Sequence, residues 1–350
     1  MQTTFDAKNI KKILVVRNDK LGDLLVSFST FAVLKKNLPN TEIHVLVSQY
    51  TAPMANLCEF IDKVIIDPAT QTSTTHHLSD ALKLTKLLKQ YNYDAIISLF
   101  STLRVAIAAR LARIPIRIAP ATKIAQIFFN HRITQRRSRS EKPEHRYNQE
   151  LAEYLLSLLN IVPLQMVYPP YLQFSPDTVQ TVKKSFCHEH HTPDNSQMIF
   201  IHPGSGGSAR NLSAQQYTQL ANMLTSEKPI TIIVSYGPNE DQVAKEVFDG
   251  ITQTKILYES NKGLEVFSQH LQFADCFISG STGPLHIAGV LDRPTAAFYT
   301  RRQSATSLRW QTLNSEQNRL AFSPPKTSAA EDMSSINIEQ AAVKISTTFL

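Results

Sequence analysis

Short apolar runs alternate along the first part of the chain with longer segments in which leucines recur at helical spacing. The runs are rich in β-branched residues, which favours strands, and segments such as LSDALKLTKLLKQY have the periodicity of an amphipathic helix. The alternation predicts parallel strands joined by right-handed crossover helices. The predicted strands of this part cover residues 13–16, 43–47, 64–67 and 95–99.

The pattern changes after HRYNQELAEYLLSLLNI, which predicts a long amphipathic helix ending near Ile161. The next stretch, VPLQMVYPPYLQFSP, is rich in proline and is typical of a junction between domains. A second alternation follows, so the sequence predicts an α/β protein with two doubly wound domains, residues 1–165 and 166–350, facing a central cleft. The last residues, SSINIEQAAVKISTTFL, predict a terminal helix, and its packing back across the domains is one interpretation. The predicted strands of the second part cover residues 198–201, 230–235, 255–257, 275–278 and 295–298.

Composition narrows the class of protein. Of 350 residues, 42% are hydrophobic and 19% are charged, which is typical of a folded chain and argues against disorder. The three cysteines are far apart and show no CxxC spacing, so we expect reduced, buried thiols in a cytosolic protein. Neither a signal peptide nor an apolar run of the roughly 20 residues that span a bilayer is visible.

The net charge of +7 is unevenly distributed, because HRITQRRSRSEKPEHR, residues 131–146, carries much of it. One interpretation is a solvated, mobile loop. The alternative is a binding segment for an anionic partner: a nucleic acid, a membrane surface or an acidic substrate.

The stretch RNDKLGD directly follows the first predicted strand. Gly22 would allow a tight turn from strand to helix, and Asp23 would lie in the first helical turn, where a carboxylate is favoured. The structural alternative is a surface ion pair between Arg17 and Asp19, with Asp23 simply opening the helix. A GxGxxG fingerprint is absent here, which argues against a nicotinamide dehydrogenase.

Two turns of the second part predict anion binding. In HPGSGGSARNLS, glycines and serines follow a strand, so backbone amides can approach an anion and Arg210 adds a positive charge. The alternative is a flexible loop before a helix capped by Ser213. In GSTGPLH, a strand ends at Ser279 and Pro284 suits the first position of a helix, whose free amides would form a second anion site. Two such turns in one domain suggest a diphosphate.

A weaker signal lies in SYGPNED, where Glu240 follows a strand and could accept hydrogen bonds from ligand hydroxyls. Capping of the next helix is an equally good explanation of this glutamate. No metal-binding motif is present in the sequence, so nothing in it requires a metal or another cofactor.

In this order and spacing, RNDKLGDLLVS, HPGSGGSARNLS, YGPNE and GSTGPLHIAGVLDRP resemble the heptosyltransferases of lipopolysaccharide core synthesis, glycosyltransferase family 9, over roughly residues 11–310. The resemblance implies a GT-B architecture, with an acceptor-binding domain followed by a nucleotide-sugar-binding domain. It implies inverting, metal-independent transfer of L-glycero-D-manno-heptose from ADP-heptose to the Kdo–lipid A inner core.

The resemblance also assigns residues. Asp23 matches the catalytic base, although Asp19 stays open as a rival, and the other matched positions contact the donor. One departure concerns Ser281, because many members place aspartate immediately before the Thr/Ser–Gly pair, so the donor sugar stays open. The implied donor-binding residues are Gly204, Ser205, Arg210, Glu240, Lys262, Ser281, Thr282, Gly283, Pro284 and His286.

The anionic acceptor implied by the resemblance gives the basic residues a role at the inner leaflet of the cytoplasmic membrane. We expect peripheral membrane association, no nucleic-acid partner and a monomer. Three alternatives stay open: a transferase using another nucleotide sugar, a nucleotide-sugar epimerase of similar architecture, and a nucleic-acid-binding protein that uses residues 131–146. The predicted acceptor-binding residues are Arg17, Lys20, Lys123, Arg132 and Arg136, with Arg137 and Arg139 as further membrane contacts.

Overall fold

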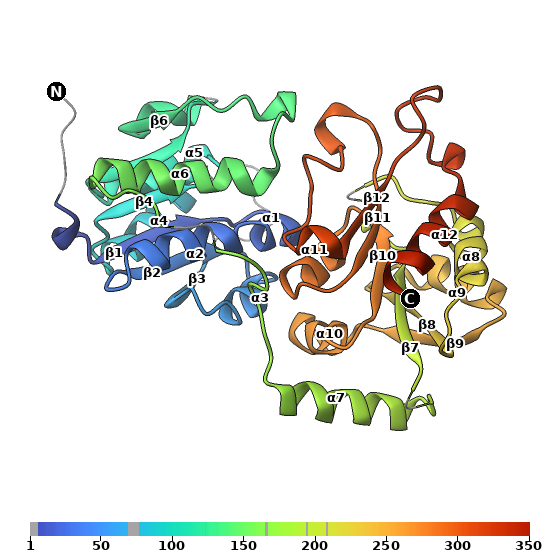
Figure 1. The fold of residues 1–350 in the computed structure, drawn as a ribbon. Helices are drawn as coiled ribbons and strands as arrows, with labels where there is room; N and C mark the ends of the chain where they lie inside the picture. The colour runs from blue at the N-terminus through green and yellow to red at the C-terminus, as the bar shows by residue number, and fades with distance from the viewer. Residues whose placement is uncertain (1–5, 69–76, 123, 165–166, 194, 208) are drawn as a thin grey trace. The chain divides into compact units, whose positions relative to one another are not determined.

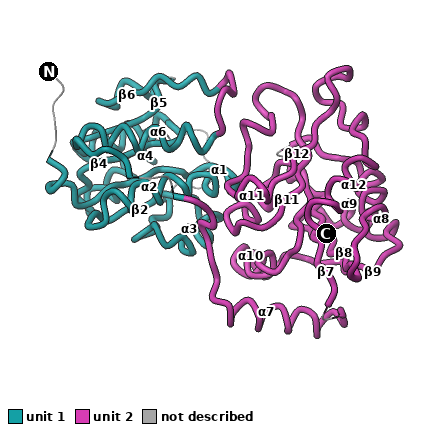
Figure 2. The backbone as a smooth tube through the Cα atoms, in the orientation of Figure 1, with its two compact units in different colours: residues 1–137, 144–167 teal, residues 138–143, 168–350 magenta. Residues whose placement is uncertain are grey.

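A computed structural model describes residues 6–68, 77–122, 124–164, 167–193, 195–207 and 209–350. Lys123, one of the predicted acceptor-binding residues, lies outside these ranges. The chain divides into two compact units, coloured separately in Figure 2: unit 1 contains residues 1–137 and 144–167, and unit 2 contains residues 138–143 and 168–350. The change of unit after residue 167 lies two residues beyond the predicted boundary, while the short segment 138–143 belongs to unit 2.

Unit 1 is built on a parallel sheet of six strands in the order β3-β2-β1-β4-β5-β6 (Figure 1). The residues of β1 that precede the predicted site, from Ile13 to Val16, are wholly buried. A central parallel strand covered on both faces requires such a continuous apolar run. The strands are β1 (Lys12–Val16), β2 (Glu42–Val47), β3 (Lys63–Ile66), β4 (Ala95–Ser98), β5 (Ile116–Pro120) and β6 (His131–Ile133).

Helices cover this sheet with their apolar faces. In the helix of residues 77–89, for example, Ala81, Leu84 and Leu88 recur at helical spacing and are buried in the core. The last helix of unit 1 packs beside its second helix (Figure 1). The helices of unit 1 are α1 (Leu21–Leu25), α2 (Phe28–Asn37), α3 (Ala52–Asn56), α4 (His77–Lys89), α5 (Leu103–Leu111) and α6 (Glu144–Leu158).

Unit 2 repeats the same plan, with a parallel sheet in the order β12-β11-β10-β7-β8-β9 (Figure 1). Numbered within each unit, both sheets have the strand order 3-2-1-4-5-6 of a doubly wound nucleotide-binding fold. The predicted α/β class with two Rossmann-like units is therefore confirmed. The strands are β7 (Gln197–His202), β8 (Ile230–Tyr236), β9 (Thr254–Glu259), β10 (Cys276–Gly280), β11 (Thr295–Phe298) and β12 (Arg319–Phe322).

The terminal helix of unit 2 packs on α8 of the same unit, where Ile338 and Ile345 join a buried cluster with Tyr217 and Leu220. This location assigns the terminal helix to the core of unit 2. The helices of unit 2 are α7 (Pro176–Glu189), α8 (Ala214–Met223), α9 (Asp241–Gly250), α10 (Leu264–Leu271), α11 (Gly283–Val290) and α12 (Ile338–Phe349). The short 3-10 helices among the described residues are η1 (Ala7–Asn9), η2 (Ile124–Phe128), η3 (Arg137–Arg139), η4 (Gln303–Ala305), η5 (Glu316–Asn318) and η6 (Met333–Ser335).

Several sequence predictions need correction. The strands β5, β6 and β12 were not predicted, because β6 and β12 are short sheet edges and Arg117 interrupts the apolar run of β5. The basic segment 131–146 is not only a loop, since it contains β6, η3 and the start of α6.

The three cysteines are free and buried, as predicted. Within the described ranges, no helix combines the length and apolarity needed to cross a bilayer.

The sheet order places the predicted motifs. In a doubly wound sheet, ligands bind outside the carboxyl ends of strands, where the strand order reverses direction. In unit 1 this point lies between β1 and β4, and RNDKLGD follows β1. In unit 2 it lies between β7 and β10, and the two predicted anion-binding turns follow these two strands.

Candidate functional site

The site of unit 1 begins where β1 ends. Lys20 has an extended backbone and opens α1, and Asp23 is the third residue of that helix, as predicted. Gly22 lies inside the helix rather than at the turn, so the tight strand-to-helix turn does not depend on it. Ser27 donates to the carbonyl of Asp23 over 2.8 Å, which fixes the end of this short helix.

Arg17 is the centre of this site and is buried, with only 2% of its side chain exposed. Its guanidinium is bonded to the Asp23 carboxylate and lies 3.2 Å from that of Asp19. The ion pair between Arg17 and Asp19 therefore exists, but it is not the surface pair of the structural alternative. A buried guanidinium next to Asp23 restricts the rotamers of the carboxylate and orients it.

Two residues from the last part of the unit 1 sequence join Arg17 and its two aspartates. Glu144, the first residue of α6, lies 3.5 Å from Arg17 and accepts a 2.6 Å bond from Arg137. Arg137 also donates to the carbonyl of Leu99, just after β4. A bond from the Asn148 amide to the Ser27 hydroxyl holds α6 against the segment after α1. The structure thus assembles an ionic cluster of Arg17, Asp19, Asp23, Arg137 and Glu144.

The charges of this cluster do not balance, because three carboxylates share two guanidinium groups. Burial raises the pKa of Asp19 to about 6; the charge of Arg17 opposes this shift, and those of Asp23 and Glu144 add to it. Asp19 should therefore become protonated in mildly acidic solution.

This raised pKa predicts how the stability of unit 1 depends on pH. A carboxyl whose pKa rises on folding stabilises the native state when protonated, so its contribution is full below about pH 4 and is lost as the pH passes about 6. Asp19→Asn should remove this slope and be more stable than the native chain above pH 6, by on the order of 1–3 kcal/mol. Urea denaturation followed by circular dichroism between pH 4 and pH 8 measures the difference.

A suitable control is Asp62→Asn, because Asp62 forms an ion pair with Lys35 elsewhere in unit 1. This control should not show the same gain on raising the pH. A constant difference between Asp19→Asn and the native chain from pH 4 to pH 8 would contradict the assignment.

The predicted acceptor-binding residues lie in different environments. Lys20, Arg132 and Arg136 are exposed, as contacts with an external partner require. Arg17 is enclosed by carboxylates of the protein, so a direct contact with an acceptor stays a prediction that requires these pairs to open. Arg137, expected at the membrane, is instead bound to Glu144.

In unit 2 the glycine-rich loop after β7 is held by Glu240. The Glu240 carboxylate accepts bonds from the amides of Gly206 (2.8 Å) and Gly237 (3.0 Å), and lies 3.3 Å from His202. Burial opposes its ionisation, but the interactions with His202 and the two amides outweigh burial and lower the pKa of Glu240 to about 2. Glu240 occupies the N-cap position of α9, but its side chain makes no hydrogen bond to that helix, so capping does not explain the carboxylate.

The loop conformation depends on glycine at three positions. Gly206 and Gly207 have positive φ angles of 51° and 73°, a region that favours glycine. A Cβ atom at Gly204 would collide with the Glu240 carboxylate. The loop therefore brings its backbone against this carboxylate, an approach that only glycine permits here.

A second link joins the glycine-rich loop to the end of β10. The Asn211 amide donates to the carbonyl of Pro203 over 2.8 Å, and its oxygen accepts a bond from the buried Tyr217 hydroxyl. A Cβ atom at Gly280 would strike the Asn211 side chain, so the two turns approach closely at this point. Asn211 and Tyr217 thus fix the spacing of the two turns.

The second turn leads into α11. Thr282 is the N-cap, and its side chain makes no hydrogen bond to the helix, so it does not occupy the first-turn amides. Gly283 and Pro284 are the first two residues of the helix, and Ser281 is half-buried before it. The free N–H groups of this turn, to which Pro284 adds none, form with the helix dipole the kind of site that binds an anion.

The remaining predicted donor residues are more scattered. His286 is buried in α11, with its ring edge-on to Trp310. The Arg210 side chain is exposed and lies 3.9 Å from Glu331. Lys262 is exposed, and its charge helps to lower the pKa of His270, after the larger effect of burial. The donor contacts of these three residues stay predictions.

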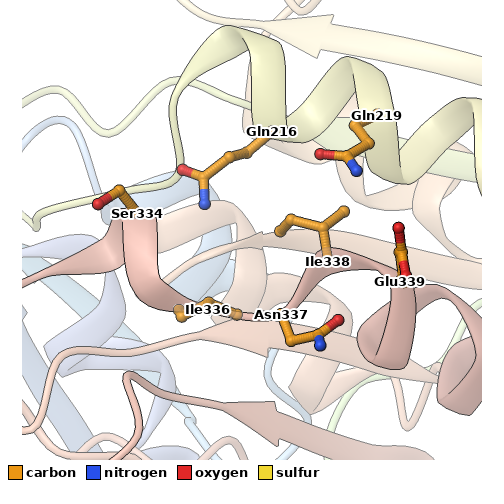
Figure 3. Close-up of a pocket in the computed structure, with 7 residues that line it drawn as sticks. All are labelled: Gln216, Gln219, Ser334, Ile336, Asn337, Ile338 and Glu339. Carbon is orange, nitrogen blue, oxygen red and sulfur yellow. The ribbon is translucent and has the colours of Figure 1, made fainter. Parts of the chain in front are cut away.

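A cavity of about 310 Å³ lies elsewhere in unit 2, between α8 and the start of α12 (Figure 3). Gln216 borders it and is already engaged, because its side chain completes a capping box with Ser213 and donates to the Met333 carbonyl. None of the predicted site residues lines this cavity. We therefore assign it to helix packing and not to the site.

Sequence reasoning did not find His202, Asn211, Tyr217 or Glu144 as site residues. His202 carried a local signal, because it ends a strand directly before the glycine-rich loop. Glu144 carried none, since it is 127 residues from Arg17 and reaches it only through the packing of α6.

Known proteins resemble this chain in sequence and in fold. A Haemophilus influenzae protein provisionally named a glycosyltransferase is 39% identical over 339 residues, covering 96% of both chains. The lipopolysaccharide heptosyltransferase 1 of Campylobacter coli is 23% identical over 295 residues, covering 82% of this chain and 83% of its own. The solved structure of the Escherichia coli ADP-heptose lipopolysaccharide heptosyltransferase II shares the fold, with a TM-score of 0.76 and 17% identity over 97% of this chain and 98% of that one.

The model of glycosyltransferase family 9 (heptosyltransferase) matches residues 81–335, which include both turns of unit 2 and the α6 side of the ionic cluster. This match covers well over half of the chain, and the fold is consistent with it. The chain is therefore a glycosyltransferase and belongs to family 9, the heptosyltransferase family.

Proposed function

We propose that this enzyme transfers L-glycero-D-manno-heptose from ADP-heptose to the Kdo–lipid A inner core of lipopolysaccharide, with inversion and without a metal ion. The observation that carries the proposal is the position of two turns, both predicted to bind anions, at the switch point of unit 2, where Asn211 links them. Two such turns suit the two phosphates of a nucleoside diphosphate. The names of the Campylobacter coli and Escherichia coli relatives support a lipopolysaccharide substrate, and the second supports ADP-heptose.

The donor is assigned to unit 2. The amides of Thr282, Gly283 and Ser205 would bind the diphosphate, with Arg210 as an added charge. The Glu240 carboxylate has two oxygens and can accept further bonds, so it suits a ribose hydroxyl while it still holds the loop. Ser281 stands in place of the common aspartate, so one rival function stays open: a related enzyme that transfers a hexose from another nucleotide sugar, called here the hexose-transferring variant. The donor experiment below distinguishes the two.

The acceptor and the proton transfer are assigned to unit 1. Asp23 removes the proton from the attacking hydroxyl while that oxygen forms a bond to the anomeric carbon. The bond from this carbon to the phosphate oxygen breaks, and ADP leaves with the electron pair. Amides aimed at the diphosphate stabilise this charge as it develops, which lowers the barrier without a proton donor. Attack opposite the leaving group inverts the anomeric centre.

The acceptor carries carboxylates and phosphates, so exposed cations suit its recognition. Lys20 stands at the start of α1, three residues before Asp23, and the exposed Arg132 and Arg136 extend the positive charge of unit 1. Peripheral association with the inner leaflet of the cytoplasmic membrane follows from this proposal, because lipid A lies there.

The hydrogen bonds from the Gly206 and Gly237 amides to the Glu240 carboxylate, called here the Glu240 latch, give a prediction about donor binding. Gly204→Ala should raise KM for the donor about 10-fold, the equivalent of one charge-assisted hydrogen bond, with a smaller change in kcat. The new methyl group displaces the Glu240 carboxylate, which is a flexible end of a side chain, so the fold should survive. Steady-state kinetics measure the effect.

The matched comparison is Glu240→Gln, which weakens the same latch without a methyl group. The two substitutions should give similar KM values and less than additive effects in the double variant. A Gly204→Ala enzyme with native KM would show that the latch has no part in donor binding.

Donor choice tests the proposed function. Purified enzyme is incubated with ADP-heptose, ADP-glucose or UDP-glucose, with and without Kdo–lipid A, and nucleotide release is followed. We expect ADP release from ADP-heptose only when the acceptor is present. Acceptor-dependent release from another sugar nucleotide would support the hexose-transferring variant, and isomerisation of a donor without acceptor would support an epimerase.

A further inference from the structure

An exposed apolar ridge lies on unit 1 outside the site described above. Ile124 and Ile127 of η2 have 75% and 63% of their surface exposed. Side chains three residues apart eclipse each other in a 3-10 helix, so both isoleucines point in the same direction. Between them Ala125 is buried with Phe129 in a small core cluster, which anchors the helix with its isoleucines outward.

The sheet pleat places a cation next to this ridge. Arg132 on β6 pairs with Ala119 on β5, and paired residues of parallel strands point to the same face. Ala119 belongs to the cluster that anchors η2, so Arg132 lies on the same face as the ridge. His131 alternates to the opposite face, where its ring contacts Tyr154 of α6.

A second cation flanks the ridge from α5, which packs on η2. Arg117 donates to the Phe128 carbonyl over 3.0 Å and so ties η2 to β5. Arg110 lies four residues after Ala106, a buried member of the cluster that anchors η2, so it lies on the same side of α5 as that cluster. Arg110 and Arg132 are exposed, and neither forms an ion pair within the described part of the chain.

We propose that this face, defined by Ile124, Ile127, Arg110 and Arg132 and called the isoleucine face, docks on an anionic lipid bilayer. The two isoleucines enter the interface between headgroups and acyl chains, and the two arginines contact lipid phosphates. The assignment extends the proposed membrane association by naming its surface, and it does not depend on the donor or on the base.

Charge complementarity favours a lipid surface over the other occupants. Two copies of the chain joined through this face would bring arginines against arginines, which is repulsive. A nucleic acid would gain little from isoleucines, because bases stack on aromatic rings and not on aliphatic side chains. An anionic bilayer satisfies both the apolar ridge and the cations beside it.

Vesicle sedimentation tests the proposal with the full chain. Vesicles of phosphatidylcholine alone are compared with vesicles that also contain phosphatidylglycerol, at low and high salt. The native chain should bind the anionic vesicles, with at least 10-fold weaker binding to the neutral ones and a clear loss at high salt. Ile124→Ser combined with Ile127→Ser should weaken binding to anionic vesicles about 10-fold, and Arg132→Gln should reduce the salt dependence.

The matched control is Val343→Ser, because Val343 of α12 in unit 2 is 64% exposed and lies on another surface. It should bind as the native chain does, and circular dichroism verifies that all variants are folded. Native binding by the double isoleucine variant would overturn the proposal, as would failure of the native chain to bind anionic vesicles. If light scattering showed the native chain as a dimer and the double isoleucine variant as a monomer, the face would instead be assigned to a second copy of the chain.

A transferase assay with the acceptor in detergent micelles separates this proposal from the proposed function. The isoleucine variants should keep native turnover there, since they are remote in sequence from Asp23 and from the donor turns. An enzyme that binds vesicles but transfers no heptose would refute the proposed function and leave the isoleucine face standing.

Discussion

Asp23→Asn should lower kcat by about 100-fold or more while the protein stays folded. Asparagine keeps the shape of the side chain and an oxygen that accepts the Arg17 hydrogen bond, but it cannot take the proton from the acceptor hydroxyl. The substitution leaves two carboxylates with Arg17 and Arg137, so the charges of the cluster balance and we expect no loss of stability. Acceptor-dependent ADP release at saturating substrate measures the effect.

The control for this prediction is Asp19→Asn, which removes the neighbouring carboxylate from the same arginine. Its kcat should stay within a few-fold of the native value at pH 8. The reason is that Asp19 helps to orient Arg17, whereas Asp23 takes the proton. The reverse result, a large loss for Asp19→Asn and a small one for Asp23→Asn, would make Asp19 the base.

Arg17→Met should have the largest effect on stability. The guanidinium is buried among Asp19, Asp23 and Glu144, and its removal leaves carboxylates without their shared cation. Removing one partner of a buried ionic cluster costs about 3–5 kcal/mol in the free energy of unfolding. Methionine preserves much of the side-chain length, so the loss reflects charge more than packing.

Hydrogen exchange is the suitable measurement, because the single tryptophan, Trp310, lies in unit 2 and does not report on unit 1. Amides of β1 should exchange roughly 10²–10⁴ times faster in the variant, as a loss of this size implies. Amides of β7 in unit 2 serve as the internal reference.

A matched control is Arg146→Met, which breaks a partly exposed ion pair with Glu153 on α6. Such a pair contributes about 1 kcal/mol or less, so exchange in β1 should change little. Adding Asp19→Asn to Arg17→Met should recover part of the lost stability, since Asp19 forms its ion pair with Arg17 whereas Glu144 keeps Arg137. Equal exchange in Arg17→Met and Arg146→Met would contradict the role of the cluster.

The sequence predicted those parts of the molecule that local patterns encode. Strands such as β1 and β10 are continuous apolar runs because they are covered on both faces, so their positions were visible within a residue or two. Edge strands are short and carry mixed patterns, which explains why β6 and β12 were missed. The turns after β7 and β10 were found because glycine, proline and serine mark them directly.

Long-range pairings were not predictable in this way. Glu144 meets Arg17 only because α6 packs against α2, and the residues between them contain most of unit 1. Glu240 was recognised as a polar residue after a strand, but its bond to the Gly206 amide depends on how two loops meet. A charge in a sequence also does not show its burial, which is why Arg17 resembled a surface cation.

The mass of the acceptor lipid after reaction shows whether this enzyme transfers heptose. Kdo–lipid A is incubated with ADP-heptose and the native enzyme, with Asp23→Asn as the matched control, and the lipid is analysed by mass spectrometry. We expect the native enzyme to add one heptose residue to the lipid, only when both substrates are present, and the control to add almost none in the same time. A lipid of unchanged mass with ADP-heptose, but of increased mass with another sugar nucleotide, would contradict it.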